Sequence, residues 1–357
     1  MTISLVTGGA GYFGTELVKQ LKANGAVVRV LDLNIPDAPI PGVEYLAGDI
    51  ANLELCLEAT RGVDTVYHNV AQVPLAKSGS QFSNVNVLGT ENICEASRKS
   101  GVRCFVYTSS SAVYGIPKSL PVQNDDLPEP LEEYGYSKLH GEFIAKGLVG
   151  SGIEVKIIRP RTILGPGRLG IFSILFEWIS KGLDIHILGQ GNDPYQFIHS
   201  EDLAAGMIRA SDLPGSFQLN LGALSYGTFR SDLQALCSYA NTGSKVVSMN
   251  EDFFRSMMRL AIKLRILPFA PYQIQLYSRG MYFDSKENWT ILDYSPKYSN
   301  ISMLIDSYEW YKQNQNQVLE TNKSHHQKPL KKLSIDFVTL LLMGKKILGL
   351  AFVKKRN

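Results

Sequence analysis

The sequence predicts an α/β protein with a doubly wound parallel sheet, because short apolar segments alternate with segments of helical pattern. The first apolar segment, Ile3–Val6, runs into a glycine-rich turn and then into a helical pattern from Thr15 to about Ala23. The segments expected to form the next strands are 27–31, 43–46, 64–68, 104–108 and 155–158. Ligands of such sheets bind at the carboxyl ends of the strands, so the residues after each segment are candidates for a site.

The glycine-rich turn indicates a dinucleotide site. Gly8, Gly11 and Gly14 are spaced G-x-x-G-x-x-G, and the missing side chains let a pyrophosphate approach the backbone amides at a helix N-terminus. The second predicted strand ends in Asp32, 18 residues after Gly14. A carboxylate at this place accepts hydrogen bonds from both hydroxyls of an adenosine ribose and repels a 2′-phosphate, which favours NAD over NADP.

A tyrosine and a lysine in Tyr134-Gly135-Tyr136-Ser137-Lys138 are the candidate catalytic pair. Residues four apart lie on one face of a helix. A phenol with a pKa of about 10 is a poor base at neutral pH, but an ammonium group beside it favours the phenolate. Tyr134 could then take a proton from an alcohol while hydride leaves its carbon. The spacing alone is common by chance, so the prediction depends on the motifs around it.

Positive charge is concentrated at the C-terminal end of the chain. The net charge is +3, and residues 328–357 hold eight Lys or Arg and one acid, which gives that segment +7 and the rest −4. A mildly acidic body gives no support for a nucleic-acid surface. The four cysteines show no paired spacing and are interpreted as reduced thiols of a cytosolic protein without a metal site. The first strand is expected to start at Thr2 or Ile3, so no signal peptide is predicted.

Several motifs together resemble the extended short-chain dehydrogenases/reductases of the NAD-dependent epimerase/dehydratase family, which is related to the 3β-hydroxysteroid dehydrogenase branch. Residues 1 to about 312 follow the family order. The matching motifs, besides Asp32, are TGGAGYFG at 7–14, GDI at 48–50, HNVA at 68–71, NVLGT at 86–90, SSSAVYG at 109–115 and YGYSK at 134–138.

The resemblance implies a Rossmann domain with a catalytic set of Ser110, Tyr134 and Lys138. Tyr134 would be the acid/base, Lys138 would hold the nicotinamide ribose and lower the pKa of the tyrosine, and Ser110 would orient the reacting oxygen. Asn86 matches a position that orders the cofactor site, although a buried structural role is an alternative. The implied cofactor-binding residues are Gly8, Gly11, Tyr12, Phe13, Gly14, Asp32, Asp49, Ile50, Val70, Ala71, Asn86, Tyr134, Lys138 and Pro160.

Departures from the family pattern bear on the reaction and the substrate. Dehydratases of the family carry Asp-Glu directly after the hydroxyl residue, where this chain has Ser111-Ala112, so dehydration is not expected. Many nucleotide-sugar members have Asn in place of Thr162 and Arg-Asp in place of Tyr195-Gln196. The candidate anion partners are Arg161, Arg168 and Arg230, each of which could instead be a solvated surface charge. His199 fits a packed structural role as well as a functional one, and it is not assigned a catalytic role. Asp202 is expected to cap a helix that begins near Leu203.

Four regions are predicted along the chain. They are a Rossmann domain at 1–160, to which later segments return, a smaller substrate lobe at 161–311, a polar linker at 312–328 and a basic apolar tail at 329–357. Residues 253–270 form a basic amphipathic pattern that could contact a membrane peripherally or cover the substrate as a lid. In 333–353 a central Lys costs about 2.5–3.5 kcal/mol on insertion, which favours a surface anchor over a spanning helix. A helix docked on the body is the alternative.

The sequence therefore predicts a cytoplasmic NAD-dependent enzyme, with peripheral contact to the inner face of a membrane as an option. The leading hypothesis is an epimerase that oxidises a secondary alcohol of a nucleotide-linked sugar. The second is a dehydrogenase that acts on a lipid-like or steroid-like alcohol at a membrane surface, and a third, less favoured, is a binding protein that senses NAD. The resemblance implies a homodimer through helices near 84–100 and 136–149.

Overall fold

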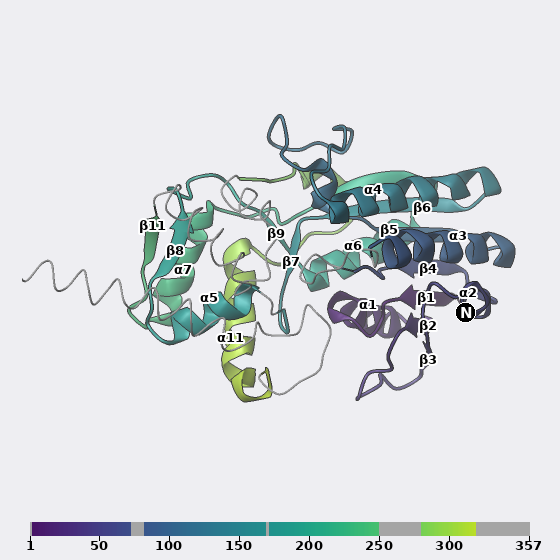
Figure 1. The fold of residues 1–357 in the computed structure, drawn as a ribbon, viewed down its shortest axis with the longest axis horizontal. Coiled ribbons are helices and arrows are strands. Elements are labelled where there is room, and N and C mark those ends of the chain that lie inside the picture. Colours follow the sequence, from purple (N-terminus) through teal and green to yellow (C-terminus); the bar gives the residue numbers. More distant parts are fainter. Residues whose placement is uncertain (1, 73–81, 169–170, 250–279, 319–357) are drawn as a thin grey trace, which may run out of the picture.

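A sheet of seven parallel strands forms the centre of the protein (Figure 1). The computed structural model describes residues 2–72, 82–168, 171–249 and 280–318. The order across the sheet is β10-β6-β5-β4-β1-β2-β3, which confirms the doubly wound parallel arrangement. The strands are β1 (Ile3–Thr7), β2 (Val27–Asp32), β3 (Val43–Ala47), β4 (Thr65–His68), β5 (Cys104–Thr108), β6 (Glu154–Pro160) and β10 (Phe217–Leu221).

Helices cover both faces of the sheet, because alternate strand residues point to opposite sides. On one face α1 (Tyr12–Ala23) and α6 (Ser200–Asp212) pack over Val6 and Val30, which are fully buried. On the other face Leu5 and Val66 lie in a second buried cluster. That cluster is covered by α2 (Leu53–Thr60), α3 (Gly89–Ser100) and α4 (Glu133–Lys146).

A second lobe lies beside the carboxyl ends of the strands, on the left of Figure 1. Its core is rich in aromatic side chains, among them Phe176 and Tyr308. The elements around this core are β8 (Ile185–Leu188), β11 (Val246–Met249), α5 (Ile171–Ser180), α7 (Phe229–Ala240) and α11 (Asn300–Val318). Between the two lobes, β7 (Thr162–Leu164) pairs with β9 (Phe197–His199).

Short elements complete the chain around the sheet. They are a π-helix, η1 (Phe82–Leu88), the 3-10 helices η2 (Ser111–Tyr114) and η3 (Gly147–Ser151), and α10 (Lys286–Ile291), which packs beside β10. Within the described residues no group of His, Cys, Asp and Glu could hold a metal ion, and all four cysteines are buried free thiols.

Two expectations from the sequence are wrong in detail. Helix α6 begins at Ser200 and is capped by His199, whose Nδ1 accepts from the amide of Glu201 at 3.2 Å. Asp202 does not cap it, because its carboxylate accepts from Tyr294 Oη at 2.9 Å and from two backbone amides of the 297–298 segment. The predicted linker also starts too early, since α11 continues as a helix to Val318.

The segments with a predicted membrane role, 253–270 and 333–353, lie outside the described residues, as does most of the predicted linker and tail. Among the helices that the structure describes, none combines the length and the apolar character needed to cross a bilayer. The domain boundary at residue 160 remains a prediction.

Candidate active site at the carboxyl ends of the strands

The glycine-rich turn between β1 and α1 lies against the ends of β2 and β4. The amide of Gly8 donates to the carbonyl oxygen of Leu31 at 2.8 Å, and Gly8 has a φ of 71°, a left-handed conformation that favours glycine. A Cβ on Gly8 would lie 3.0 Å from the backbone nitrogen of Val70, and a Cβ on Gly14 would lie 2.0 Å from the carbonyl oxygen of Gly8. The turn can therefore form only from residues without side chains at these positions.

The N-terminus of α1 and the end of β2 form the part of the crevice expected to hold the dinucleotide. Helix α1 begins after Gly11, which offers no side-chain cap to the first amides. Asp32 Oδ2 accepts from the amide of Ala10 at 3.0 Å, so the carboxylate is fixed beside the glycine turn. Burial raises the pKa of Asp32, and the backbone amides that it accepts from oppose this rise.

A buried chain of two hydroxyls and one imidazole supports the backbone after β4. Thr90 donates to the carbonyl oxygen of Asn86 at 2.7 Å, so its oxygen accepts from His68 Nε2 at 3.0 Å. His68 Nδ1 is then the acceptor for the Thr7 hydroxyl at 2.7 Å. Burial, together with the charge of Lys138, lowers the pKa of His68 to about 3. His68 is therefore neutral and structural at physiological pH.

Asn86 connects the segment after β4 with α4. Its Oδ1 accepts from the amide of Gln72 at 2.7 Å, and its Nδ2 donates to the Gln72 carbonyl oxygen at 3.2 Å and to Ser137 Oγ at 2.8 Å. This fully buried side chain fixes the backbone next to Ala71. The geometry suits a residue that orders the site, while direct contact with a cofactor remains a prediction.

The other residues predicted to bind the cofactor have surroundings that differ from one residue to the next. Asp49 is exposed and accepts from the amide of Ala51 at 2.9 Å. Ile50 and Phe13 are buried among apolar side chains, and Pro160 ends β6 in a buried position. Val70 lies against Gly8. Their contacts with a cofactor remain predictions.

Ser110 and Tyr134 meet beyond the carboxyl end of β5. The side chains of Ser110 and Tyr134 are hydrogen-bonded to each other, and Ser110 Oγ also accepts from the amide of Ala112 at 3.1 Å. The two neighbouring serines have other partners, since Ser109 donates to a carboxylate at 2.5 Å and Ser111 accepts from a guanidinium at 2.9 Å. The geometry thus selects Ser110 among three adjacent serines as the partner of Tyr134.

Burial changes the pKa values of both members of the Tyr–Lys pair. It raises the pKa of Tyr134 to about 12, while the hydrogen bond from Ser110 and the charge of Arg168 act in the opposite direction. Burial lowers the pKa of Lys138 to about 7, and the charge of Glu142 opposes this shift. Lys138 Nζ lies 4.7 Å from the centre of the Tyr107 ring. The lowering of the Tyr134 pKa expected from Lys138 is not found, because desolvation of the phenol dominates.

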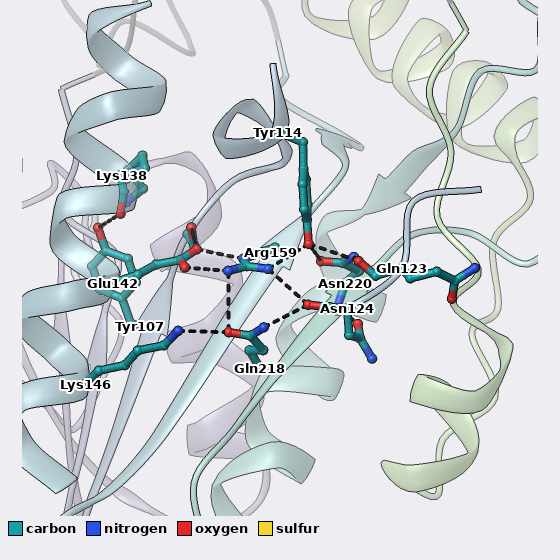
Figure 2. Close-up of polar contacts among 11 residues, drawn as sticks. Tyr107, Tyr114, Gln123, Asn124, Lys138, Glu142, Lys146, Arg159, Gln218 and Asn220 are labelled. Atoms are coloured by element: carbon teal, nitrogen blue, oxygen red, sulfur yellow. Dashed lines mark hydrogen bonds and ion pairs between the residues drawn. The ribbon is translucent and has the colours of Figure 1, made fainter. Parts of the chain in front are cut away.

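An ion pair between α4 and β6 lies one helical turn beyond Lys138 (Figure 2). Glu142 accepts from Arg159 through both carboxylate oxygens, at 2.8 Å from Nε and 2.6 Å from Nη2, and both side chains are almost fully buried. Glu142 Oε1 also accepts from Ser109 Oγ. One carboxylate therefore connects α4 with Ser109, directly after β5, and with Arg159 on β6.

The Arg159 guanidinium extends this network to β10, the edge strand of the central sheet (Figure 2). Its Nη1 donates to Tyr114 Oη at 2.7 Å, and Tyr114 in turn donates to Asn220 Oδ1 at 2.8 Å on β10. Burial acts to lower the pKa of Arg159, but the hydrogen bonds and charges of Glu142 and Tyr114 outweigh it, so the pKa is raised. Both ends of the ion pair are satisfied, as buried charges require.

Sequence reasoning missed Glu142 and Arg159 as parts of the site. A signal was available, because Tyr134, Lys138 and Glu142 are spaced i, i+4, i+8 and must share one face of α4. The partner of Glu142 could not be predicted, since it lies 17 residues further on and on another element.

The residues at the strand ends fit an NAD molecule. The turn has no side chains where a pyrophosphate would approach, and Asp32 ends β2 at the place expected for ribose recognition. In the described part of the chain, Asn69 Nδ2 is a buried donor without a hydrogen-bond partner, directly after β4. A ligand in the crevice would provide the missing acceptor.

The fold and the site define a Rossmann enzyme that uses NAD. Residues 4–222 match the model of the NAD dependent epimerase/dehydratase family, and the chain belongs to this family. Membership of this family agrees with the NAD-dependent enzyme that the Tyr–Lys pair predicts.

Three relatives illustrate the range of the family. The chain is 46% identical over 329 residues to the uncharacterized protein y4nG of Sinorhizobium fredii, covering 92% of this chain and 83% of that protein. It is 30% identical to the bovine (Bos taurus) sterol-4-alpha-carboxylate 3-dehydrogenase, decarboxylating, over 58% of this chain and 59% of that protein's length. It is 31% identical to the UDP-glucose 4-epimerase of Mycolicibacterium smegmatis, over 61% of this chain and 76% of that protein.

A solved structure agrees with the fold over most of the chain. The structure of MoeE5 in complex with UDP-glucuronic acid and NAD superposes with a TM-score of 0.70 at 25% identity. The match covers 87% of this chain and 99% of that chain.

The buried ion pair leads to a prediction about stability. Glu142→Gln leaves the Arg159 charge buried without a counter-ion, so the free energy of unfolding should fall by about 3–5 kcal/mol. Urea unfolding of both proteins measures this difference. The control is Glu95→Gln, which removes an exposed ion pair with Arg98 and should lower the free energy of unfolding far less, because solvent screens that pair. Equal losses in the two variants would contradict the role assigned to Glu142.

The low pKa of Lys138 leads to a second prediction, on the pH dependence of stability without added NAD. Above pH 7 the folded protein releases the Lys138 proton, whereas the unfolded chain keeps it up to the model value of 10.5. Wild-type stability should therefore rise with pH relative to Lys138→Met, by about 1.4 kcal/mol per pH unit. Urea unfolding of both proteins at about pH 7.5 and about pH 9 measures this difference in slope. Parallel profiles would mean that Lys138 keeps its proton when folded.

Proposed function

We propose that the protein is an NAD-dependent epimerase-type oxidoreductase that oxidises a secondary alcohol of a nucleotide-linked sugar. One observation carries the proposal. The Ser110–Tyr134 hydrogen bond lies beyond the carboxyl end of β5, and Lys138 follows one helical turn later on α4. This is an acid/base pair at the place where the sheet would present a nicotinamide ring.

The residues of the site have separate tasks in this reaction. NAD, when bound, would supply a hydride acceptor and a positive charge that favours the tyrosinate. Ser110 donates a hydrogen bond to the reacting oxygen and orients it. Tyr134 takes the hydroxyl proton as the carbonyl forms and returns it when the ketone is reduced again. Lys138 holds the nicotinamide ribose, and its ammonium group supports the deprotonated phenol.

The nucleotide-sugar assignment is supported by the resemblance to the mycobacterial UDP-glucose 4-epimerase and to MoeE5 bound to UDP-glucuronic acid. Thr162 and Gln196 weaken the assignment of a nucleotide-sugar substrate, because they stand where many nucleotide-sugar enzymes have Asn and Asp. Gln196 is fully buried, and its side chain accepts from the amide of Phe283 at 2.9 Å and donates to Ala223 O at 2.7 Å. It is thus a structural residue that connects strand segments of the second lobe.

The second candidate is a dehydrogenase that acts on a lipid-like or steroid-like alcohol. It is favoured by the resemblance to the bovine sterol-4-alpha-carboxylate 3-dehydrogenase and to the mycobacterial 3 beta-hydroxysteroid dehydrogenase/Delta 5-->4-isomerase. In this case residues 253–270 and 333–353 would provide the peripheral membrane contact. The two candidates differ in a direct measurement, since an epimerase accumulates no NADH and a dehydrogenase does.

Tyr134→Phe tests both candidates against a binding protein that only senses NAD. Loss of the acid/base should lower turnover by about 10²–10⁴-fold, while the dissociation constant of NAD should change little. Turnover is followed through NADH absorbance and through the stereochemistry of the product, and NAD binding through calorimetry. Unchanged turnover would refute the assignment of Tyr134.

We further propose a homodimer in which the exposed face of α4 contacts a second copy. Tyr136 and Phe143 are 59% and 63% exposed and lie two turns apart on this helix. Large apolar side chains at such a place indicate a protein contact. Light scattering should give a dimer mass for the wild type and a monomer mass for the double variant Tyr136→Glu/Phe143→Glu. Leu127→Glu, at an exposed loop position, is the control and should remain a dimer.

A further inference from the structure

The ammonium group of Lys138 lies over the face of an aromatic ring. Its Nζ is 4.7 Å from the centre of the Tyr107 ring on β5, which is within the range of a cation–π contact. Both residues are buried, with 2% and 1% of their surfaces exposed. Within the described residues, Lys138 forms no ion pair and its side chain donates no hydrogen bond. The ring is therefore the side-chain contact that compensates this charge for the loss of water.

Lys156 on β6 provides a comparison at the same distance from a ring. Its Nζ lies 4.7 Å from the centre of the Phe217 ring. It also donates to the Glu154 carboxylate at 3.4 Å and to two backbone carbonyl oxygens, one of them at 2.6 Å. An ammonium group has three N–H donors, so those of Lys156 are all used. Lys138 has the ring without such oxygen atoms in the described part of the chain, which leaves its donors available to a ligand.

The position of the Tyr107 ring is fixed by the helix that carries Lys138. Tyr107 Oη donates to the backbone carbonyl oxygen of Lys138 at 3.3 Å. A Cβ at Gly141, also on α4, would lie 2.0 Å from this hydroxyl oxygen, so a residue with a side chain would push the ring away. The centres of the His68 and Tyr107 rings are 5.7 Å apart. Strand β5 and helix α4 therefore hold the ring and the ammonium group in one register.

The other titratable groups around Lys138 do not replace the ring. Glu142 lies one helical turn further along α4, and its charge favours the ammonium form. Both of its carboxylate oxygens accept from Arg159, so this charge is shared with a second cation. His68 and Tyr134 are uncharged at physiological pH, because burial lowers the pKa of the first to about 3 and raises the pKa of the second to about 12. An aromatic face carries partial negative charge and attracts a cation without accepting a hydrogen bond from it.

We infer that Tyr107 is a positioning residue, whose ring face holds the Lys138 ammonium group charged and in place for the cofactor. The inference rests on the proposed function, in which Lys138 binds the nicotinamide ribose. In this role Tyr107 acts through Lys138 and needs no contact with the cofactor or the substrate. The ring supplies the electrostatic attraction, and the N–H donors of Lys138 then supply the hydrogen bonds to the ribose hydroxyls.

The pH dependence of NAD binding tests this role without turnover. Calorimetry with the full-length protein gives the dissociation constant of NAD from about pH 6 to about pH 9. In the wild type the constant should begin to rise near pH 7, where the pKa of Lys138 lies, because the neutral amine has lost its charge and one donor. Lys138→Met should bind NAD more weakly and should show no such rise.

Substitutions at Tyr107 separate the ring from the hydroxyl group. Tyr107→Leu removes the ring, so the pKa of Lys138 should fall by about one further unit, and at about pH 8 NAD should bind about tenfold more weakly than to the wild type. Tyr107→Phe keeps the ring and should retain the wild-type profile. The matched control is Phe105→Leu, which removes a ring from the same strand and the same buried cluster and should also keep the wild-type profile.

A second series keeps the shape of the side chain, in case Tyr107→Leu does not fold. Phenylalanine with one, two or three fluorine atoms on the ring is introduced at position 107. The fluorine atoms draw electron density from the ring face at almost constant size, which weakens its attraction for a cation. The pH at which NAD binding begins to weaken should fall step by step with each added fluorine atom.

The pH profiles have three distinguishable outcomes. A stepwise fall along the fluorine series, with an unchanged profile for Phe105→Leu, would support Tyr107 as the residue that holds Lys138. Equal profiles across the fluorine series, or equal shifts in Tyr107→Leu and Phe105→Leu, would overturn the inference and leave the proposed function standing. A rise that persists in Lys138→Met would overturn the role of Lys138 in the proposed function, and the inference with it.

Discussion

The ion pair between Glu142 and Arg159 is the interaction on which the site depends. It joins the helix that carries Tyr134 and Lys138 to the ends of the two strands that carry Ser109 and Pro160. Helix and strands could otherwise slide relative to each other, because apolar packing is not directional. A bidentate carboxylate–guanidinium pair fixes both distance and angle. The short separation between Ser110 and Tyr134 thus depends on a contact that touches neither residue.

Two nearby arginines, Arg159 on β6 and Arg161 directly after it, have different surroundings. Arg159 has an internal counter-ion and supports the structure, whereas Arg161 has only neutral partners within the described residues and faces the second lobe. The difference follows from the partner each side chain meets and not from its own chemistry.

The sequence predicted the sheet, the glycine turn and the Tyr–Lys pair because each depends on residues close together in the chain. It selected Ser110 among three serines from the resemblance alone, and the hydrogen bond to Tyr134 supports that choice. Glu142 and Arg159 could not be paired in advance, because their contact forms only after α4 has packed on the sheet. The cap of α6 was misplaced for a similar reason, since Asp202 satisfies the amides of a segment more than 90 residues later. The direction of the Tyr134 pKa was also wrong, because desolvation depends on the whole fold.

The deep burial of Lys138 has a consequence for attempts to make the protein more robust. An ammonium group that is 2% exposed opposes folding, so replacing it with an apolar side chain relieves that penalty. Selection for heat resistance alone would therefore enrich substitutions at this position and would discard the group to which the proposed reaction assigns the nicotinamide ribose. Directed evolution of this enzyme should therefore measure turnover and heat resistance in the same round, because selection for heat resistance favours replacing Lys138 and selection for turnover favours keeping it.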